Sequence, residues 1–297
     1  MSPGAVQRLA AEHALPVGCA LGEGPRWDVE HGVLSWVDIH GCAIHRWSPE
    51  TNESEITQTS DVVGAVAATS DGRTVAAIGT SIVLDPGGPA ETLLAVLPAA
   101  DRTQVRCNDG RAGPDGAFWI GTMALDHRSP VACLYRVAPD GSVTVHLEHL
   151  TISNGLGWSS DGEWFYHIDT PSQTVTRRRF SVDTLGRDVD VLTRLDPSEG
   201  SPDGLAVDAE GGVWVALWGA GQVRRYDSSG QLDTVITTPG APYVTALTFG
   251  GAELNRLFIT TARPEAEQAG SHGGDLFICD VDTTGLREGL VSLGAVA

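Results

Sequence analysis

The stretch ISNGLGWSSDGEWFYHIDT, residues 152–170, shows the pattern that decides the fold of this 297-residue chain. Two apolar runs, which we expect to be strands over 153–158 and 163–168, flank the turn SSDG. Asp-Gly pairs are typical of the tight turns that join neighbouring antiparallel strands. Two further runs, 173–180 and 190–195, follow before the pattern starts again. This part of the chain is therefore predicted to be a unit of four short strands.

An apolar run after a turn occurs six times along the chain, at spacings of 39, 44, 46, 49 and 44 residues. The central residues of these runs are Trp36, Val75, Trp119, Phe165, Trp214 and Phe258. Units of about 45 residues with four strands each are typical of a β-propeller. Segments with helical periodicity are nearly absent, which excludes a barrel of eight strands and eight helices. We predict an all-β, six-bladed β-propeller with four antiparallel strands per blade, a single domain over residues 1–297.

Two segments lie outside this regular pattern. AVQRLAAEH, residues 5–13, precedes the first unit, and we expect it to close the ring as an outer strand of the last blade. ARPEAEQAGSHGG, residues 262–274, is the longest polar, Gly-rich loop within a unit. Because mobile surface loops often cover binding sites, this loop is a candidate lid over substrate.

One position of the innermost strand is equivalent in all six units. We counted back eleven residues from the central apolar residue in four units, and thirteen in the first and last. The resulting positions are Glu23, Gly64, Asn108, Asn154, Asp203 and Thr245. Four residues further on, every unit carries an apolar side chain, which supports this register. We expect the position to face the central channel, so that four strong oxygen donors meet there.

The four donors are two carboxylates, Glu23 and Asp203, and two amides, Asn108 and Asn154. An all-oxygen set with two negative charges suits a hard divalent cation such as Ca²⁺, Mg²⁺ or Mn²⁺. No His or Cys belongs to the set, so a structural zinc site is not expected, whereas Zn²⁺ with open positions stays an alternative. Simple hydrogen bonding of channel water is the other interpretation of these residues.

The charge of the chain limits its partners. Asp and Glu number 38 against 19 Lys and Arg, a net charge of −19, and every one of the cations is Arg. Because nucleic acids and anionic membranes need a basic surface, we expect neither as a partner. The absence of Lys excludes a Schiff-base lysine and a P-loop. The five cysteines are scattered without a CxxC motif, and the N-terminus does not resemble a signal peptide, so a cytoplasmic location is expected.

Several stretches resemble a known family. They are LGEGPRWD (21–28), RCNDGRAGPDGAFWIGTM (106–123), the opening stretch (152–170), SPDGLAVDAEGGVWVALWG (201–219) and FITTARPE (258–265). In this order, and over nearly the whole chain, they are similar to the SMP-30/gluconolactonase/regucalcin family. The resemblance implies a six-bladed propeller of metal-dependent lactonases, which agrees with the repeat count.

The resemblance also implies roles for particular residues. The metal-binding glutamate, asparagine and aspartate of the family fall on Glu23, Asn154 and Asp203. Its Arg-x-Asn-Asp stretch falls on Arg106 and Asn108, which are expected to hold substrate or a water molecule of the metal site. The family often has a substrate-contacting Glu after GTM-A. This chain has Asp126 there, one carbon shorter, which leaves the preferred sugar open.

Two further residues have two interpretations each. Asp109 follows Asn108 and is either a second acid beside the ring of oxygen donors or a turn residue. Trp218 ends a second strand near the expected mouth of the channel, where it either walls the pocket or packs against its neighbours.

The combined prediction is a metal-dependent carboxylic ester hydrolase that opens a small sugar lactone, converting an aldonolactone to an aldonate. The cation would polarise the lactone carbonyl and stabilise the oxyanion, and Asp203 would be the general base for water. A phosphotriesterase on the same metal propeller and a non-catalytic calcium-binding or scaffold propeller remain alternatives. The sugar, the oligomeric state and the choice among calcium, zinc, manganese, magnesium and iron stay open.

Overall fold

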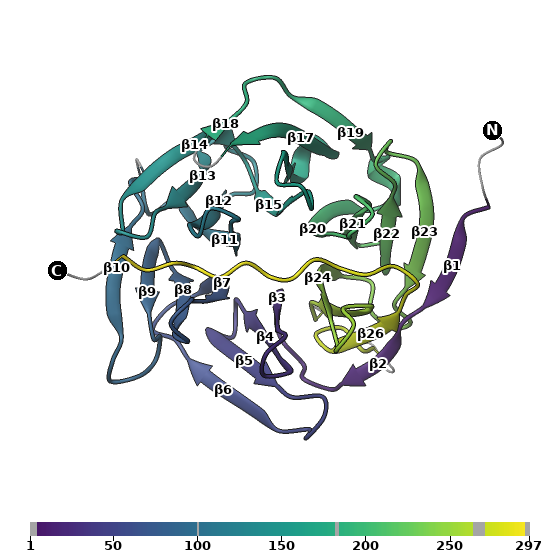
Figure 1. Ribbon diagram of the computed structural model, residues 1–297, viewed down its shortest axis with the longest axis horizontal. Coiled ribbons are helices and arrows are strands. Elements are labelled where there is room, and N and C mark those ends of the chain that lie inside the picture. The colour runs from purple at the N-terminus through teal and green to yellow at the C-terminus, as the bar shows by residue number, and fades with distance from the viewer. Residues whose placement is uncertain (1–4, 100, 182–183, 264–270, 295–297) are drawn as a thin grey trace.

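The computed structural model describes residues 5–99, 101–181, 184–263 and 271–294. Within these residues the strands form six small sheets around a central channel, which is the predicted six-bladed propeller (Figure 1). The helices of the described residues are two 3₁₀ turns, η1 (Thr170–Ser172) and η2 (Pro197–Glu199). Neither is long and apolar enough to cross a membrane.

Each blade starts with an inner strand at the channel and continues outward as an antiparallel meander. The first blade consists of β3 (Gly22–Asp28), β4 (Val33–Asp38), β5 (Ala43–Trp47) and β6 (Ser54–Gln58). The second consists of β7 (Val63–Ala68), β8 (Thr74–Ile78), β9 (Ser81–Leu84) and β10 (Thr92–Val96). The third consists of β11 (Val105–Ala112), β12 (Phe118–Ala124), β13 (Ala132–Val137) and β14 (Val143–Leu150).

The other three blades follow the same plan. The fourth blade consists of β15 (Ser153–Trp158), β16 (Trp164–Asp169), β17 (Thr174–Ser181), β18 (Thr184–Leu185) and β19 (Asp190–Arg194). The fifth consists of β20 (Ser201–Val207), β21 (Val213–Trp218), β22 (Gln222–Tyr226) and β23 (Leu232–Thr237). The sixth consists of β24 (Val244–Gly250), β25 (Arg256–Thr261) and β26 (Leu276–Asp280). In the fourth blade, strands β15, β16, β17 and β19 lie within one residue of the four predicted strands.

The N-terminal segment closes the ring differently from our prediction for residues 5–13. Its first part, β1 (Gln7–Ala10), pairs in parallel with β23 of the fifth blade, and only β2 (Glu12–Leu15) joins the last blade, antiparallel to β26. Between them the backbone N–H of Ala11 donates to the carbonyl oxygen of Thr237 (2.8 Å). The physical reason is that both outer edges, β23 and β26, have unpaired backbone groups, and one extended segment pairs with both.

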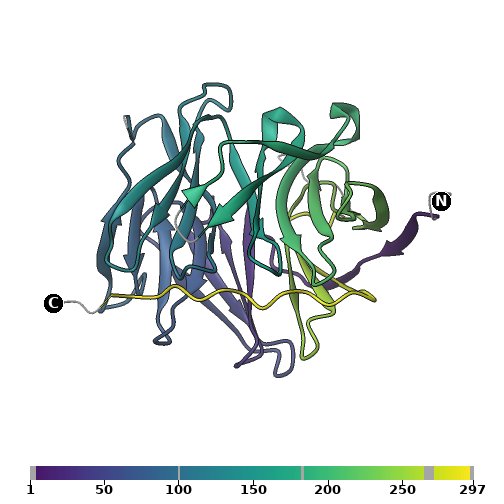
Figure 2. The ribbon, with the colours of Figure 1, turned by 45° about the horizontal axis from the view of Figure 1, so that its top comes forward.

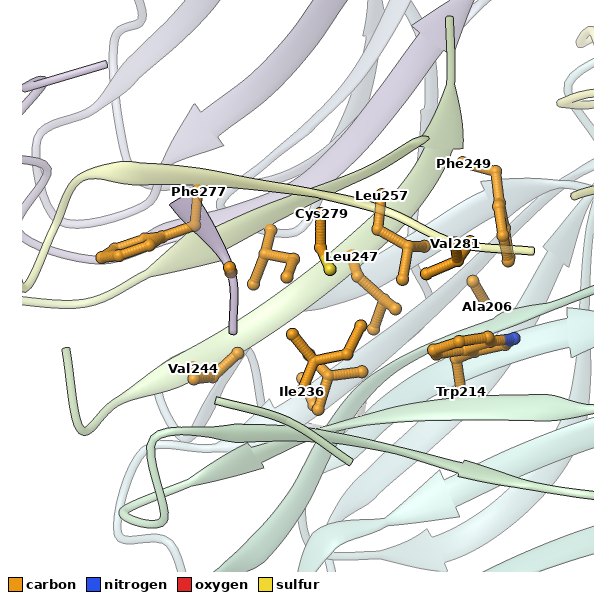
Figure 3. Packing of buried hydrophobic residues seen from close by; sticks show 14 of the residues in the cluster. Ala206, Trp214, Ile236, Val244, Leu247, Phe249, Leu257, Phe277, Cys279 and Val281 are labelled. Atoms are coloured by element: carbon orange, nitrogen blue, oxygen red, sulfur yellow. The ribbon is translucent and has the colours of Figure 1, made fainter. Parts of the chain in front are cut away.

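The central apolar residues of the six units lie in the layers between blades. Trp36, Val75, Trp119, Phe165, Trp214 and Phe258 each expose at most 1% of their surface. Figure 3 shows one of these layers, where Trp214 and Ile236 of the fifth blade pack against Leu247 and Phe249 of the sixth. Burial of this apolar surface holds neighbouring blades together, at about 25 cal/mol per Å². The burial of all six residues confirms the repeat alignment.

A buried polar network anchors the fifth blade behind its inner strand. Both oxygens of Asp208 are used, and Oδ2 accepts from the side chains of Trp214 (Nε1, 2.8 Å) and Arg225 (Nε, 2.7 Å). The backbone N–H groups of Glu210 (3.0 Å) and Gly212 (2.8 Å) donate to the same carboxylate. The third blade has the matching set Asp115, Trp119 and Arg136.

Residues 282–294, which we call the strap, cross one face of the ring (Figures 1 and 2). The strap is hydrogen bonded to several blades, for example through Val291 N to Ala68 O (2.9 Å) and Gly285 N to Leu254 O (2.7 Å). From its middle, Glu288 contacts two inner strands: it accepts from Thr248 Oγ1 (3.0 Å) and pairs with Arg111 Nη2 (3.3 Å). The strap therefore covers the end of the channel that lies opposite the ring of oxygen donors.

Candidate active site

Each of the six inner strands described has a shift in register at the predicted ring position or, on β3, directly after it. On β15 the pairing with β16 jumps from Ser153 to Leu156, which leaves Asn154 and Gly155 opposite a single residue. Equivalent shifts occur on β3, β7, β11, β20 and β24. A β-bulge bends the strand and re-aims its side chains, and bulges are frequent beside functional sites. Here a bulge accompanies each of the four oxygen donors, whose side chains lie in one buried region.

The structure brings the four predicted oxygen donors together in a buried site. Glu23, Asn108, Asn154 and Asp203 each expose no more than 6% of their surface. The charge of Glu23 raises the pKa of Asp203, and the charge of Arg106 lowers the pKa of both carboxyl groups. These interactions place the two carboxylates and the guanidinium close enough to affect one another. They lie at the end of the channel opposite the strap, which we call the ring end after the ring of oxygen donors.

The remaining two ring positions bring the inner strands close to one another. Thr245 donates its hydroxyl to the carbonyl oxygen of Gly22 (2.5 Å), which ties the sixth blade to the first. A Cβ on Gly64 would lie 2.6 Å from the carbonyl oxygen of Asn108. This close approach explains glycine at that position, because a side chain there would push the second and third blades apart.

Two oxygen atoms of the ring are buried without a hydrogen-bond partner, Oδ1 of Asn154 and Oδ1 of Asp203. The amide nitrogen of Asn154 donates to Thr170 Oγ1 (3.1 Å), and Thr170 in turn donates to the carbonyl oxygen of Pro202 (2.9 Å). Thr170 therefore fixes the orientation of Asn154, a role that no sequence motif signalled to us. An unsatisfied buried polar group costs about 1–3 kcal/mol, so such atoms usually have a partner. A divalent cation fits these two oxygens together with the carboxylate of Glu23.

Asn108 differs from Asn154, because its side-chain amide is already paired within the protein. Its Oδ1 accepts from Arg106 Nη1 (2.8 Å), and its Nδ2 donates to the carbonyl oxygen of Ser153 (3.0 Å). The arrangement fixes the buried guanidinium of Arg106, which keeps further donors for the oxygens of a bound molecule. Burial raises the pKa of the adjacent Cys107 to about 12, so no thiolate nucleophile is available at this point.

Burial and like charges dominate the electrostatics of the two carboxylates. Burial, followed by the charge of Asp109, raises the pKa of Glu23 to about 8, against the lowering effects of the Gly24 N–H group and Arg106. Burial, followed by the charges of Glu23 and Asp109, raises the pKa of Asp203 well above its ordinary range. A bound cation would reverse this cost, because it favours both carboxylates in their charged form.

Asp109 is an acid beside the ring and not a turn residue. It lies in the bulge of β11, is buried, and pairs with Arg26 Nη2 (3.1 Å). Arg26 also donates to the carbonyl oxygens of Pro25 (2.7 Å) and Gly110 (2.6 Å). Three carboxylates therefore lie near two guanidiniums in this part of the channel, which leaves an excess of negative charge for a cation to balance.

Trp218 lies at the ring end of the channel, because it pairs with Ser201 at the start of β20. Its side chain is 37% exposed, and its ring lies 4.6 Å from that of Tyr243. Of the two interpretations of Trp218, this exposure favours a wall of the pocket, since a core Trp would be covered.

Two predicted elements lie elsewhere. Asp126 lies in an exposed turn after β12, where its carboxylate accepts from Arg128 N (2.9 Å), Ser129 N (2.8 Å) and Ser129 Oγ (2.5 Å). The structure does not bring it into the ring, and its contact with substrate stays a prediction. Most of the candidate lid, residues 262–274, falls on 264–270, which lie outside the described residues.

Comparison with known proteins identifies the family of this chain. Residues 21–263 match the family described as the SMP-30/Gluconolactonase/LRE-like region. The chain belongs to this family.

Relatives within the SMP-30 family include regucalcin of Danio rerio, which is 35% identical over 246 residues, 82% of this chain and 83% of that protein. Pentonolactonase XacC of Haloferax volcanii is 31% identical over 292 residues, 94% of this chain and 97% of that protein. The crystal structure of a calcium-binding protein, regucalcin from Agrobacterium tumefaciens, has a TM-score of 0.90 at 28% identity. That similarity covers 98% of this chain and 100% of the other.

Proposed function

We propose that this SMP-30 family protein is a metal-dependent lactonase that converts a sugar lactone to the corresponding sugar acid. The observation that carries the proposal is the pair of buried oxygens without partners, Asn154 Oδ1 and Asp203 Oδ1, next to the buried Glu23. Oxygens in this state suit a cation, and a channel covered at the other end by the strap suits a small substrate that enters from the ring end. The name of the relative XacC, a pentonolactonase, supports a lactone as the substrate class.

Glu23, Asn154 and Asp203 would hold the cation, and Asn108 would not, since its oxygen is paired with Arg106. Oxygen ligands of this type suit Ca²⁺, Mg²⁺ and Mn²⁺, and Zn²⁺ or iron would fit with open positions. The calcium-binding relative of known structure supports calcium as the first ion to test. When bound, such a cation supplies Lewis-acid polarisation of the lactone carbonyl.

Asp203 is the proposed general base. Its carboxylate accepts a proton from the attacking water as the water oxygen adds to the carbonyl carbon of the lactone. The bond between that carbon and the ring oxygen then breaks, and the proton passes to the ring oxygen, which becomes the hydroxyl group of the sugar acid. Burial raises the pKa of Asp203 in the metal-free protein, and a bound cation would keep the carboxylate in the charged form that can accept the proton.

Arg106 and Trp218 are proposed to orient the substrate. The guanidinium of Arg106, fixed by Asn108, donates to sugar oxygens, and its planar fork restricts how the sugar can lie. Trp218 offers an exposed aromatic face at the same end of the channel, on which the apolar face of a sugar ring can stack. The predicted contact from Asp126 would be made by a residue that the closed turn 126–129 already holds in place.

The test is hydrolysis by protein freed of metal with a chelator and then reloaded with one ion at a time. Each form is assayed on gluconic, xylonic, arabinonic, galactonic and fuconic lactones and on a phosphotriester. We expect lactone hydrolysis that depends on the ion and is lost in Glu23→Ala and Asp203→Asn. Wild-type rates in both variants would refute the site. Hydrolysis of the phosphotriester alone would favour the phosphotriesterase, and ion binding without any hydrolysis would favour the scaffold.

We also infer a cytoplasmic location. Cys19, Cys42, Cys107, Cys133 and Cys279 are all free. An oxidising compartment favours disulfides, so five free thiols support a reducing one. Cell fractionation with an antibody against the chain would test this location.

A further inference from the structure

A second group of metal-ligating side chains lies at the outer edge of the last blade, far along its sheet from the channel. The group consists of His13 on β2 and of His272 and Asp275, which precede β26. Figure 1 labels these two neighbouring strands. One ligand atom from each residue lies within 4.8 Å of the other two. β2 and β26 are the two outermost strands of the sheet, whose order is β2-β26-β25-β24. We refer to His13, His272 and Asp275 as the seam cluster.

The ladder that closes the ring brings these residues together. His13 is directly opposite Phe277 in the antiparallel pair of β2 and β26. Asp275 is two residues before Phe277 and so lies on the same face, as a diagonal neighbour of His13. His272 is placed by a tight turn, because the N–H group of Asp275 donates to its carbonyl oxygen (3.2 Å) and its own N–H group donates to Gly240 O (3.0 Å).

Both imidazoles face the same carboxylate oxygen. Oδ2 of Asp275 lies 2.8 Å from Nε2 of His13 and 3.6 Å from Nδ1 of His272. The two imidazole rings are 4.3 Å apart, at 36° to each other. In a tetrahedral zinc site, with bonds of about 2.0–2.1 Å, neighbouring ligand atoms are about 3.3 Å apart, a value between these two distances. Both nitrogen–oxygen distances are therefore close to the spacing of two ligand atoms on one zinc ion.

Neighbouring groups fix the orientation of two members of the seam cluster, Asp275 and His13. The other oxygen of Asp275, Oδ1, accepts from the backbone N–H group of Gly18 (2.9 Å), which fixes the carboxylate. The ring of His13 packs edge-on against Phe277, with centroids 5.6 Å apart. Secondary contacts of this kind orient metal ligands and raise affinity. The side chains of His13 and His272 are 32% and 45% exposed, so water can complete the coordination.

We propose that His13, His272 and Asp275 form a second metal site, for a divalent transition metal such as Zn²⁺, that staples the N-terminal strand β2 to the last blade. Two imidazoles with one carboxylate suit Zn²⁺, whereas Ca²⁺ prefers oxygen ligands. A dication can be held by the Asp275 carboxylate and by one nitrogen of each neutral imidazole at the same time. The site does not depend on the proposed lactonase function.

Bound zinc can be counted by equilibrium dialysis of the chelator-treated protein against micromolar Zn²⁺, followed by metal analysis. The variants are His13→Ala and His272→Ala. The matched control is His31→Ala, because His31 also pairs with an aspartate, Asp28 (Nδ1–Oδ2, 2.7 Å), but has no second imidazole in the pair. We expect the wild type and the control to bind one zinc equivalent more than either seam variant.

The variant Glu23→Ala distinguishes zinc bound by the ring of oxygen donors from zinc bound by the seam cluster. If the ring also takes zinc, Glu23→Ala loses one equivalent and keeps the other, and the double variant with His272→Ala loses both. Zinc is also expected to raise the midpoint of thermal unfolding of the wild type by several degrees, and not that of His272→Ala. The far-UV circular dichroism spectra of both seam variants should match that of the wild type, which shows that they fold. Equal zinc content in the wild type and both seam variants would overturn the proposal and leave a simple His–Asp ion pair.

Discussion

The inner strand β20 of the fifth blade has a buried aspartate at each end, and the two differ in their hydrogen bonds. Asp203, at the ring end, has one oxygen without a partner and a raised pKa. Asp208, just beyond the strap end, accepts from two backbone N–H groups and from the side chains of Trp214 and Arg225. Burial alone therefore does not separate the two aspartates. The difference is that the proposed metal ligand has an acceptor oxygen left open.

The tryptophans of the neighbouring strand β21 show the same contrast. Trp214 is buried and donates to Asp208, whereas Trp218, four residues later, is exposed beside Tyr243. At the strap end of the channel, the carboxylate of Asp208 and the indole N–H group of Trp214 are hydrogen bonded within the protein. The ring end leaves a carboxylate, an amide and an aromatic face free for something from outside the chain.

The largest effect is expected from Asp203→Asn. The proposed general base is lost, so kcat/KM for the lactone should fall by about 10²–10⁴-fold. The free energy of unfolding of the metal-free protein should stay the same or rise, because a neutral amide removes the cost of keeping this buried carboxyl group protonated. The measurement is steady-state kinetics together with denaturant unfolding. A large loss of stability in the metal-free variant would mean that Asp203, like Asp208, stabilises the fold.

Asp208→Asn should give the opposite result. The substitution leaves Arg225 without the carboxylate at its Nε atom, and breaking such a buried pair should lower the free energy of unfolding by about 3 kcal/mol. Below the unfolding transition, kcat per active site should stay close to that of the wild type. Urea denaturation and an active-site-normalised assay would check both parts. A fall in kcat as deep as that of Asp203→Asn would break the comparison.

The stability of the metal-free protein should depend on pH through the ring carboxylates. The folded pKa of Glu23 is raised from 4.5 to about 8, so between these values the folded state holds a proton that the unfolded state has lost. Stability is then fully present below about pH 4.5 and is lost as the pH rises through about 8. Thermal unfolding at pH 6 and pH 8.5 in chelator measures this loss, and Glu23→Gln should flatten it. Saturating Ca²⁺ should reverse the trend, because the ion favours the charged carboxylates.

The smallest effect is expected at Trp218. Its replacement by Ala removes an aromatic contact worth about 0.5–1.5 kcal/mol, so KM should rise by up to about tenfold with little change in kcat. Trp214→Phe should leave KM unchanged and lower stability by about 1 kcal/mol through the lost hydrogen bond to Asp208. The pair of kinetic and unfolding measurements separates the two roles. If Trp218→Ala changes stability and not KM, then this tryptophan packs and does not bind.

The blades could be predicted because each repeats one local pattern, an apolar run after an Asp-Gly turn, and the spacing of Trp119, Phe165 and Trp214 sets the register of the inner strands. That register located Asn154 and Asp203 by counting alone. The bulges that aim them could not be predicted, because a bulge depends on the partner strand and not on one stretch of sequence. The position of β1 on the fifth blade also depends on which edge is left unpaired in three dimensions. The turn that holds the carboxylate of Asp126 is formed by local contacts that the family resemblance does not describe.

The seam between β2 and β26 has a consequence for how the chain reaches its folded state. The contact of His13 with Asp275 joins residues 262 positions apart, and contacts of such long range form slowly. Until the N-terminal segment pairs, the outer edges of β23 and β26 present unpaired backbone groups on which another chain could pair. The period before ring closure is therefore when the protein is most exposed to aggregation, and any interaction that speeds closure would raise the yield of folded molecules.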